Sequence, residues 1–507
     1  MKPEPRSWGR WPRARHELRA LRWRHEPLPL APEDSPALPA GNGRSYGDVA
    51  LNDGGILLDA RGLDRFIAFD PHRGIVRAEA GVLLAELLEL VLPAGWFLPV
   101  TPGTRFVTLG GAVANDIHGK NHHHAGSFGH HVTALELLRS DGSRFRLSPD
   151  ERPKLFRATV GGLGLTGLIT WVELALRPLG PAPSAPSAPS AASEARPADS
   201  RPELRIETET LPFEGLGAFF DLSRDSDEAW EHTVAWLDLS PGAQERARGL
   251  FMRGNHASRE EGTGDPSSRS APGGPRGGEP GAGMADRELL RAAGLLPPRL
   301  SVPFVPPVSL VNGVTVALFN RAYRLREGRR RGRRKVPLGP FFHPLDGVRH
   351  WNRVYGPGGF VQWQCVLPEG EAREGLAAIL RGLRLGGAAS FLSVLKVFGE
   401  REGVGVLSFA RPGVTLAVDL VHRGIETLAL LDALDRIVVE AGGAIYPAKD
   451  ARMAPATFRA SFPGWEAMGP HLDPALSSSF WRRVTGSDSA ANTGAHERAG
   501  AHSGRER

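Results

Sequence analysis

Three glycine-rich segments combine small residues with side chains that can handle charge and protons. Residues 41–48 read GNGRSYGD, residues 108–121 read TLGGAVANDIHGKN, and residues 160–167 read VGGLGLTG. Glycine and alanine let the backbone approach a flat, extended ligand closely, and successive N–H groups in such loops can bind phosphate oxygens. His118 and Lys120 add an acid or base and a cation. We therefore expect these segments to surround a phosphate-bearing ligand at a site of acid–base or electrostatic chemistry.

Two common nucleotide motifs do not fit these segments. Residues 162–167 match G-x-G-x-x-G, but the dinucleotide fingerprint follows a strand and opens a helix, whereas this match follows a predicted helix and opens a predicted strand. Gly119 and Lys120 are followed by Asn121 in place of Ser or Thr, which excludes a P-loop.

The second segment also runs into a histidine-rich stretch that suggests a metal site. Histidine occupies positions 118, 122, 123, 124, 130 and 131. Adjacent histidines in an extended loop point in different directions, and no carboxylate pattern accompanies them. We predict that the protein holds no metal ion.

Lysine and cysteine are rare in this chain of 507 residues. Among 62 Lys and Arg, the lysines are Lys2, Lys120, Lys154, Lys335, Lys396 and Lys449. Because lysine is rare here, we consider each lysine a candidate for a chemical role. The single cysteine, Cys365, excludes an intramolecular disulfide and any site with several thiolate ligands.

The elements that must position these residues alternate between short strands and short helices. Apolar or alternating runs predict strands, and helical spacing predicts helices. Expected strands cover residues 55–60, 66–70, 74–82, 132–139, 144–147, 168–176, 234–239, 360–367, 391–398 and 414–421; expected helices cover 83–91, 154–160, 372–383 and 425–441. The pattern predicts an α+β fold.

Neither a signal peptide nor a transmembrane segment is expected. The N-terminus lacks an apolar h-region, and no stretch approaches the ~18 apolar residues of a spanning helix. Much of the basic excess lies in residues 321–335, RAYRLREGRRRGRRK, for which we predict a solvated loop; attraction to phosphate or anionic lipid is the alternative. Since the formal net charge is only +6, we expect no nucleic-acid partner, and a cytoplasmic location or a peripheral one at the inner membrane.

These motifs resemble the flavoproteins with a vanillyl-alcohol-oxidase (PCMH-type) FAD-binding domain, above all the decaprenylphosphoryl-ribose oxidases among them. The resemblance covers most of the chain, through GNGRSYGD, TPGTR at 101–105, LGGAVANDIHGKNHHHAGSFG at 109–129 and TVGGLGLTG at 159–167. It resumes at HPLD (343–346), WNRVYGP (351–357), VLKVFG (394–399) and AKD (448–450).

The resemblance implies a two-domain protein whose FAD-binding domain is split in sequence. It assigns residues 6–179 to the FAD-binding domain, 203–442 to a substrate domain with an antiparallel sheet and flanking helices, and 443–484 to a return to the FAD domain. Composition predicts a disordered linker at 180–202, a disordered insertion at 254–285 and a disordered tail at 485–507.

The resemblance also implies the residues that bind FAD. They are Gly41, Gly43, Arg44, Ser45, Tyr46, Gly47, Asn52, Pro102, Gly103, Thr104, Gly110, Gly111, Ala114, Asn115, His118, Gly119, Asn121, Gly126, Gly162, Gly164, Gly167, Ile169 and Lys449. Aldonolactone and alditol oxidases of the superfamily carry, at the position of Arg44, a histidine bonded covalently to the flavin. Arginine cannot form that bond, so we predict non-covalent FAD.

The reaction implied is the oxidation of a secondary sugar alcohol, with hydride transfer to flavin N5. Catalytic roles fall to Lys449, His118 and Lys120, and substrate contacts to Trp236, Gln364, Lys396, Phe398, Thr415 and Ala417. The expected substrate is a polyprenylphosphoryl-ribose-like sugar oxidised to a 2′-keto sugar, the first half of an epimerisation, with a short-chain reductase as a further partner. Ala417 and Phe342 stand where related oxidases carry a pocket cysteine and a tyrosine.

Two alternatives remain open at this point. One is an oxidase of soluble aldonolactones or alditols, and the other is a flavin- or metal-binding protein without turnover.

Overall fold

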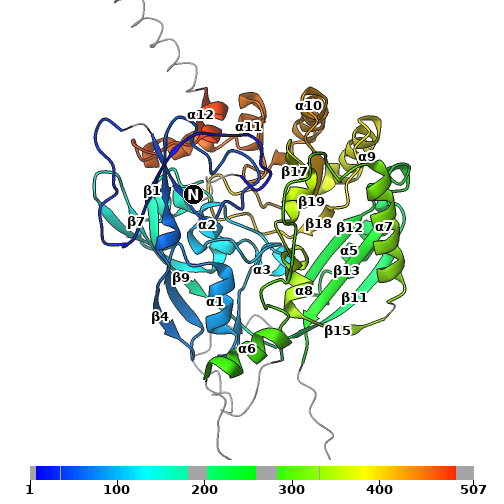
Figure 1. The fold of residues 1–507 in the computed structure, drawn as a ribbon, viewed down its shortest axis with the longest axis horizontal. Helices are drawn as coiled ribbons and strands as arrows, with labels where there is room; N and C mark the ends of the chain where they lie inside the picture. Colours follow the sequence, from blue (N-terminus) through cyan, green and yellow to red (C-terminus); the bar gives the residue numbers. More distant parts are fainter. Residues whose placement is uncertain (1–6, 35, 181–202, 259–281, 331, 487–507) are drawn as a thin grey trace, which may run out of the picture.

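The computed structural model describes residues 7–34, 36–180, 203–258, 282–330 and 332–486. It confirms the α+β class, with helices packed on separate antiparallel sheets. In Figure 1 the N-terminal sheets lie on one side and a large sheet with its helices on the other. The predicted linker and most of the predicted insertion and tail lie outside the described residues.

The N-terminal layer contains two sheets. A parallel sheet has the order β1 (Glu17–Ala20), β3 (Ile56–Asp59), β2 (Ala37–Ala40), and an antiparallel sheet has the order β4 (Phe66–Asp70), β5 (Ile75–Glu79), β9 (Leu168–Ala175), β7 (Val132–Leu138), β8 (Arg144–Leu147). The strands expected at 132–139 and 144–147 form the antiparallel pair β7–β8, and the helix expected at 83–91 is α1 (Leu84–Val91). Apolar residues of α1, among them Leu84, Leu87, Leu88 and Val91, are buried at helical spacing.

The second layer is one antiparallel sheet of eight strands. Its order is β15 (Arg334–Pro337), β11 (Arg205–Phe213), β13 (Gly249–His256), β12 (His232–Leu237), β18 (Ser393–Phe398), β19 (Gly413–Val421), β17 (Phe360–Leu367), β20 (Ala444–Ile445). One face packs against α9 (Glu369–Leu385) and α10 (Ile425–Glu440), where Cys365 and Leu416 meet Leu376 and Leu431 in the largest apolar core. The opposite face is free to line a cavity.

The remaining helices and strands connect or flank these sheets. They are β6 (Trp96–Phe97), α2 (Leu109–Ala114), α3 (His122–Ala125), α4 (Pro153–Thr159), β10 (Arg177–Pro178), α5 (Leu216–Arg224), α6 (Ala282–Ala292), β14 (Leu300–Ser301), α7 (Gly313–Gly328), α8 (Leu338–Phe342), β16 (Val348–Arg349), α11 (Pro455–Ser461) and α12 (Ser479–Thr485).

The C-terminal segment contacts both layers. Strand β20 pairs with β17 of the eight-stranded sheet. A few residues later the carbonyl of Ala448 accepts a 3.0 Å hydrogen bond from the N–H of Tyr46. Arg483 binds Asp48 and Asp450, both at 2.8 Å, and so ties the first glycine-rich loop to the chain end.

Asp116 forms a second connection between the layers. Its buried carboxylate accepts hydrogen bonds from Gly129 N–H (2.8 Å) and the Ser127 hydroxyl (2.9 Å) on its own side. From the loop that follows β18 it accepts from the Ser408 hydroxyl (2.6 Å) and Val404 N–H (3.1 Å). Four donors satisfy a carboxylate that would otherwise be costly to bury.

Two expectations about the second half need correction. The arginine-rich run, expected as a loop, forms the end of α7 and the start of β15. The carboxylate of Glu327 explains the difference, because it binds Arg330 at 3.1 Å and Arg334 at 2.8 Å and so offsets part of the repulsion between the guanidinium groups. The expected insertion at 254–285 also overlaps ordered elements, since β13 continues to His256 and α6 begins at Ala282.

Candidate active site

A cavity of about 710 Å³ lies between the glycine-rich loops and the free face of the eight-stranded sheet. The loops at 39–46, 101–111 and 163–169 form the walls on the N-terminal side. Strands β12, β17, β18 and β19 supply the opposite wall, and the segment 446–449 also lines the cavity.

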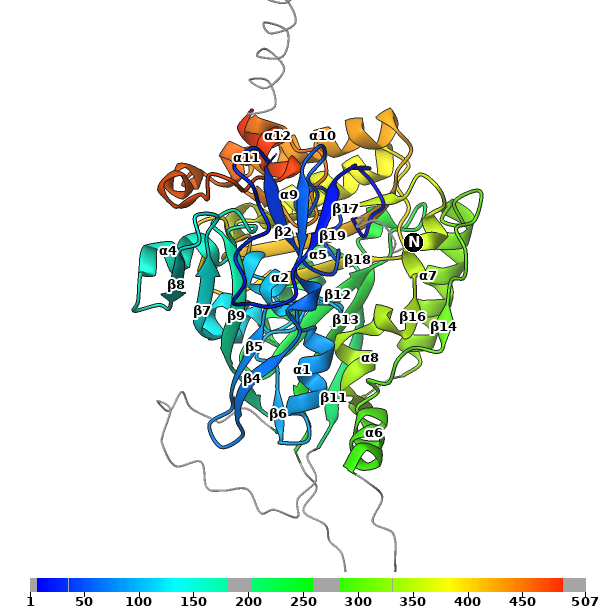
Figure 2. The same ribbon diagram turned by 60° about the vertical axis from the view of Figure 1, so that its left-hand side comes forward.

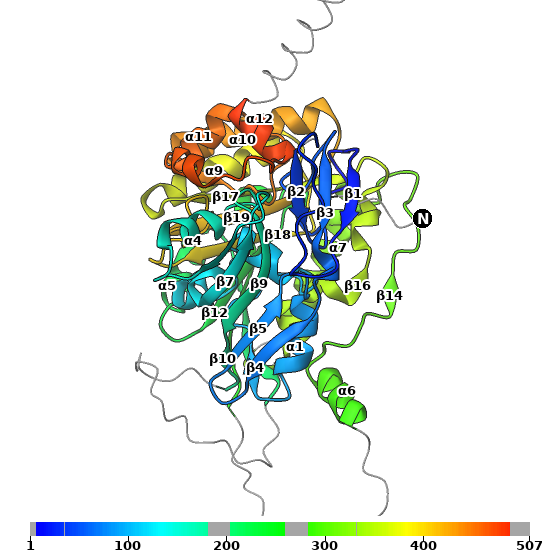
Figure 3. The same ribbon diagram turned by 90° about the vertical axis from the view of Figure 1, so that its left-hand side faces the viewer.

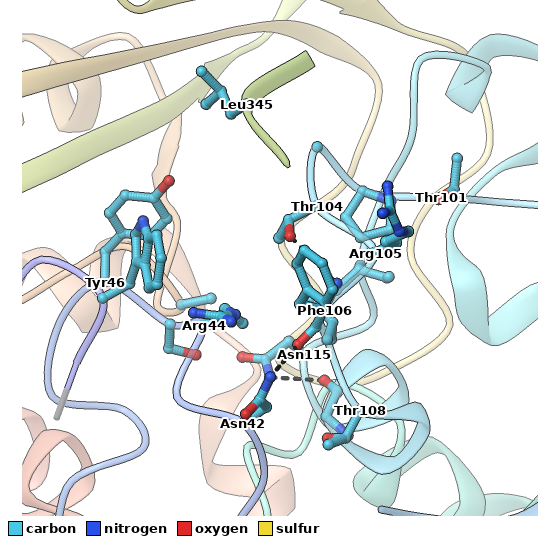
Figure 4. A pocket seen from close by; sticks show the side chains of 18 of the residues that line it. Asn42, Arg44, Tyr46, Thr101, Thr104, Arg105, Phe106, Thr108, Asn115 and Leu345 are labelled. Atoms are coloured by element: carbon cyan, nitrogen blue, oxygen red, sulfur yellow. Dashed lines mark hydrogen bonds between the residues drawn. The ribbon is translucent and has the colours of Figure 1, made fainter. Parts of the chain in front are cut away.

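The first glycine-rich loop is held against the second by named side chains. Asn42 donates a 2.8 Å hydrogen bond to the carbonyl of Phe106. The Thr108 hydroxyl accepts from Gly111 N–H at 3.2 Å and caps the start of α2. Figure 4 shows Arg44 reaching toward Phe106, whose ring centre is 5.7 Å from the guanidinium carbon.

The cavity wall contains polar groups that the protein itself does not satisfy. Nε of Arg44, Oγ1 of Thr101 and Oδ1 of Asn115 are buried without a hydrogen-bond partner among the described residues. A Cβ at Gly103 would meet no protein atom within 4 Å. Because buried polar groups are normally paired, the wall fits a large polar ligand such as FAD, which would pair with these atoms and pass close to Gly103.

His118 is the centre of a buried polar cluster. Lys396 Nζ lies 3.1 Å from its Nδ1, and the side-chain amide of Gln364 lies 3.2 Å from its Nε2. The same Lys396 donates to the carbonyl of Gly119 at 3.3 Å, and Gln364 donates to Thr415 Oγ1 at 3.0 Å. Burial, and after it the charge on Lys396, holds the pKa of His118 well below its usual range, so the imidazole is neutral at pH 7.

Lys449 lines the cavity from the segment 446–449. Its Nζ lies 3.9 Å from the centre of the Tyr46 ring, which favours the charged form through a cation–π contact. Burial lowers the pKa of Lys449 to about 7, against the attraction of the nearby Asp419 carboxylate. Asp419 in turn accepts hydrogen bonds from Gln362 and Tyr355.

Lys120 faces the cavity from the other side of His118. Its ammonium donates to the carbonyl of Phe341 and lies 4.3 Å from the centre of that ring. Burial lowers its pKa to about 8. Lys120, Lys396 and Lys449 therefore place three titratable amino groups around one cavity.

Sheet register explains how residues expected to contact the substrate come together from distant parts of the chain. Trp236 pairs with Val394, Val394 with Ala417, and Ala417 with Gln364, so one row crosses β12, β18, β19 and β17. Lys396 and Thr415 form the pair two positions along. Since directly paired residues of antiparallel strands share a face, these side chains line the same wall.

Most of the residues expected to bind FAD or substrate line this cavity. They are Gly41, Gly43, Arg44, Ser45, Tyr46, Pro102, Gly103, Thr104, Gly110, Gly111, Ala114, Asn115, His118, Gly119, Gly164, Gly167, Ile169 and Lys449, with Lys120, Trp236, Gln364, Lys396, Thr415 and Ala417.

Six expected residues are not part of the cavity wall. Gly47, Asn52, Asn121, Gly126, Gly162 and Phe398 lie behind it or to one side. Three of them have structural roles. A Cβ at Gly47 would lie 1.6 Å from the Asp450 carbonyl oxygen. The Asn52 amide donates to the carbonyls of Pro36 and Ile56, and the Asn121 amide donates to the carbonyl of Pro99. Phe398 packs 4.8 Å from the His118 ring and supports it.

Sequence reasoning missed several wall residues. Gln362 precedes Gln364 by two positions on β17, so the strand period alone places both on one face. Asp346 lines the opposite side and accepts from Arg105 N–H at 2.9 Å. Tyr323 and Tyr446 also reach the cavity, and nothing in their local sequence indicates it.

One group in the described part of the chain has the composition of a metal site. Ligand atoms of Glu231, His232 and His256 lie within 4.8 Å of one another. Arg177 already binds both carboxylate oxygens of Glu231, at 2.7 and 2.5 Å. After burial, the charges of Arg177 and Lys120 are the largest causes of the low pKa of His232, so two cations already oppose a metal ion here. The group fits an ion pair beside neutral histidines.

Comparison with known proteins assigns the chemistry of this cavity. A family model described as an FAD binding domain matches residues 30–148, which contain the first two glycine-rich segments. Over 451 residues the chain is 34% identical to decaprenylphosphoryl-β-D-ribose oxidase of Mycolicibacterium smegmatis, covering 88% of each chain. This chain belongs to the decaprenylphosphoryl-β-D-ribose oxidase family.

Other relatives place the match within the superfamily. An uncharacterized protein of Streptomyces coelicolor is 32% identical over 382 residues, covering 75% of this chain and 92% of that protein. L-gulonolactone oxidase of Mus musculus is 30% identical over 138 residues, covering 27% and 31%. The likeness to the ribose oxidase covers 88% of this chain, whereas the likeness to the lactone oxidase covers only about a quarter of it. The predictions of an FAD cofactor and of an FAD-dependent oxidoreductase acting on a CH–OH group are confirmed.

Proposed function

We propose that this enzyme oxidises the 2′-hydroxyl carbon of a polyprenylphosphoryl-β-D-ribose-like sugar to a ketone. The observation that carries the proposal is the group of polar side chains Gln364, Lys396 and Thr415 on β17, β18 and β19, which faces the glycine-rich loops across one cavity. Bound FAD supplies the hydride acceptor of the reaction. The likeness to the ribose oxidase through this sheet supports the sugar class.

The residues around the cavity have different roles in the proposed oxidation. Lys396 and Gln364 hold His118 between them and present hydrogen-bond groups to the sugar hydroxyls. Neutral His118 can accept the hydroxyl proton only at its unprotonated ring nitrogen, once the substrate hydroxyl replaces the present partner, Lys396 or Gln364, at that nitrogen. Lys449 places a positive charge where negative charge develops on the cofactor side. The substrate must be held so that its C–H bond faces the flavin.

The substrate assignment is tested by anaerobic bleaching of the bound flavin. We expect bleaching by a polyprenylphosphoryl ribose, and little or none by aldonolactones or alditols at the same concentration. Bleaching by the soluble sugars alone would identify an aldonolactone- or alditol-type oxidase instead. Failure of every sugar to bleach a flavin-loaded protein would support a binding protein without turnover.

The cofactor is held without a covalent bond in this proposal, because Arg44 occupies the first loop. Acid precipitation should release all the flavin into the supernatant, and flavin retained in the pellet would contradict it. The keto sugar product then requires a separate hydride donor, such as a short-chain reductase, to complete an epimerisation.

A further inference from the structure

Large apolar side chains are exposed in one segment of the second layer, residues 300–325. Among the described residues, the exposed large apolar side chains outside this segment are scattered: Trp23, Phe66, Leu385 and Ile425. Those within it are Leu300, Phe304, Val308, Leu310, Val314, Leu318, Phe319 and Leu325. Scattered exposed residues are ordinary, whereas a concentration of this kind marks an interaction site.

Helix α7 within this segment exposes a stripe of apolar side chains to solvent. Val314, Leu318, Arg321 and Leu325 follow helical spacing on one exposed stripe. Two of the three buried residues of the helix, Asn320 and Glu327, are polar. The Asn320 amide donates to Asp238 at 2.9 Å and to the Ser390 carbonyl at 3.1 Å. A surface helix normally buries its apolar stripe, so the outward stripe of α7 calls for a partner outside the chain.

The segment contacts the wall of the cavity. Tyr323 of α7 packs edge-on against Trp236, with 5.0 Å between ring centres, and both side chains line the cavity. Leu300 pairs with Val348, which also lines the cavity. Figures 2 and 3 show α7, β14 and β16 on the same flank of the molecule.

Positive charge accompanies the apolar stripe. Between residues 313 and 330 the chain carries Arg321, Arg324, Arg326, Arg329 and Arg330 against the single acid Glu327. One carboxylate leaves most of this charge in place, and Arg321 lies within the exposed apolar stripe itself. Apolar side chains beside arginines are typical of surfaces that enter the headgroup region of an anionic bilayer.

We propose that residues 300–325 dock on the surface of an anionic lipid bilayer, with the cavity mouth facing the membrane. Val314, Leu318 and Leu325 enter the interface, and the arginines bind lipid phosphates. A bilayer fits better than a protein partner, because Arg321 would lose its water in a dry protein interface but can extend to the headgroups of a membrane. The proposal adds to the proposed function by stating where a lipid-linked sugar would enter.

Vesicle co-sedimentation of the full-length FAD-loaded protein tests the docking. The probes are phosphatidylglycerol-rich vesicles and pure phosphatidylcholine vesicles. Leu318→Ser/Leu325→Ser removes part of the stripe, and Arg321→Gln/Arg329→Gln removes charge. The matched control is Leu385→Ser/Ile425→Ser, since these side chains are 74% and 81% exposed elsewhere on the molecule.

We expect wild type and control to bind the anionic vesicles and to bind phosphatidylcholine far less. Each double variant should lower the partition onto anionic vesicles by about tenfold. Wild type that stays in the supernatant, or stripe variants that sediment like wild type, would overturn the proposal. A change of oligomeric state in the stripe variants, seen by sedimentation velocity with vesicle binding unchanged, would do so in favour of a protein interface.

Flavin bleaching by a short-chain, water-soluble phosphoribose analogue separates this proposal from the proposed function. The stripe variants should bleach like wild type, since none of their changed residues lines the cavity. Vesicle binding without bleaching would leave the docking surface standing and remove the substrate assignment. Bleaching without vesicle binding would support the substrate assignment and overturn the docking surface.

Discussion

Lys396 and His118 form a direct contact, with 3.1 Å between the lysine Nζ and the histidine Nδ1. Both groups are buried, and burial lowers the pKa of Lys396 to about 7, helped by the charges of Lys120 and Lys449. The lysine can donate only to a histidine whose Nδ1 is unprotonated. In a neutral imidazole one nitrogen carries the proton, so a lysine that donates to Nδ1 leaves the proton of His118 on Nε2.

Replacing this lysine should impair the reaction without removing the cofactor. Lys396→Met loses the hydrogen bond to His118, and we expect flavin reduction by substrate to slow by about 10²-fold at unchanged FAD content. The pKa of His118 should rise as the neighbouring charge disappears, which moves the acidic limb of the rate–pH profile upward. Lys154→Met, at an exposed position on α4, is the control. Wild-type rate and pH profile would remove Lys396 from the site.

We expect Lys449 to lower the free energy of unfolding of the flavin-free protein. Its pKa is about 7 when folded, against an ordinary value of 10.5, so the unfolded chain binds more protons between these values. Stability therefore rises as the pH increases through this range. Lys449→Met should be more stable than wild type at about pH 6, with a smaller advantage at about pH 9. Urea unfolding of flavin-free proteins at both pH values measures this, and a variant less stable at the lower pH would refute it.

Two glycines of the cofactor side should respond to substitution in opposite ways. A Cβ at Gly103 meets no protein atom within 4 Å, so Gly103→Val should fold normally and bind FAD more weakly. A Cβ at Gly47 would lie 1.6 Å from the Asp450 carbonyl oxygen, so Gly47→Ala should lower the melting temperature. Flavin titration and thermal unfolding of both flavin-free variants check the pair. Unaltered FAD affinity in Gly103→Val would mean that the ligand passes elsewhere.

Cys365 should resist thiol reagents in the folded protein. Its side chain is fully buried against α9 and α10, and burial raises the pKa of the thiol. Neighbouring Gln364 faces the cavity, so Cys365 points to the other side of β17. Titration should find no reactive thiol before denaturation and one after it. Because the cavity wall offers Ala417, inhibitors that bond to a pocket cysteine should bind only reversibly; native labelling at Cys365 would contradict the placement.

Strand periodicity made the sheet and much of the site predictable. Runs such as residues 360–367 have the composition of buried strands, and the period of two places Gln364 on one face and Cys365 on the other. Helix α7 could not be predicted in the same way, because its arginines do not follow the spacing of a buried helix face. They lie on the exposed face of the helix or bind Glu327. Asp419 likewise comes near Lys449 only in the folded sheet, where β17 pairs with β19 on one side and with β20, which leads to Lys449, on the other.

The contacts between Tyr46 and Ala448, and of Arg483 with Asp48 and Asp450, carry a consequence for synthesis of the protein. On a translating ribosome the first glycine-rich loop is made long before its partners at residues 448–483. A nascent chain thus lacks a finished flavin site until those residues have left the exit tunnel, so the cofactor should be captured only after that point.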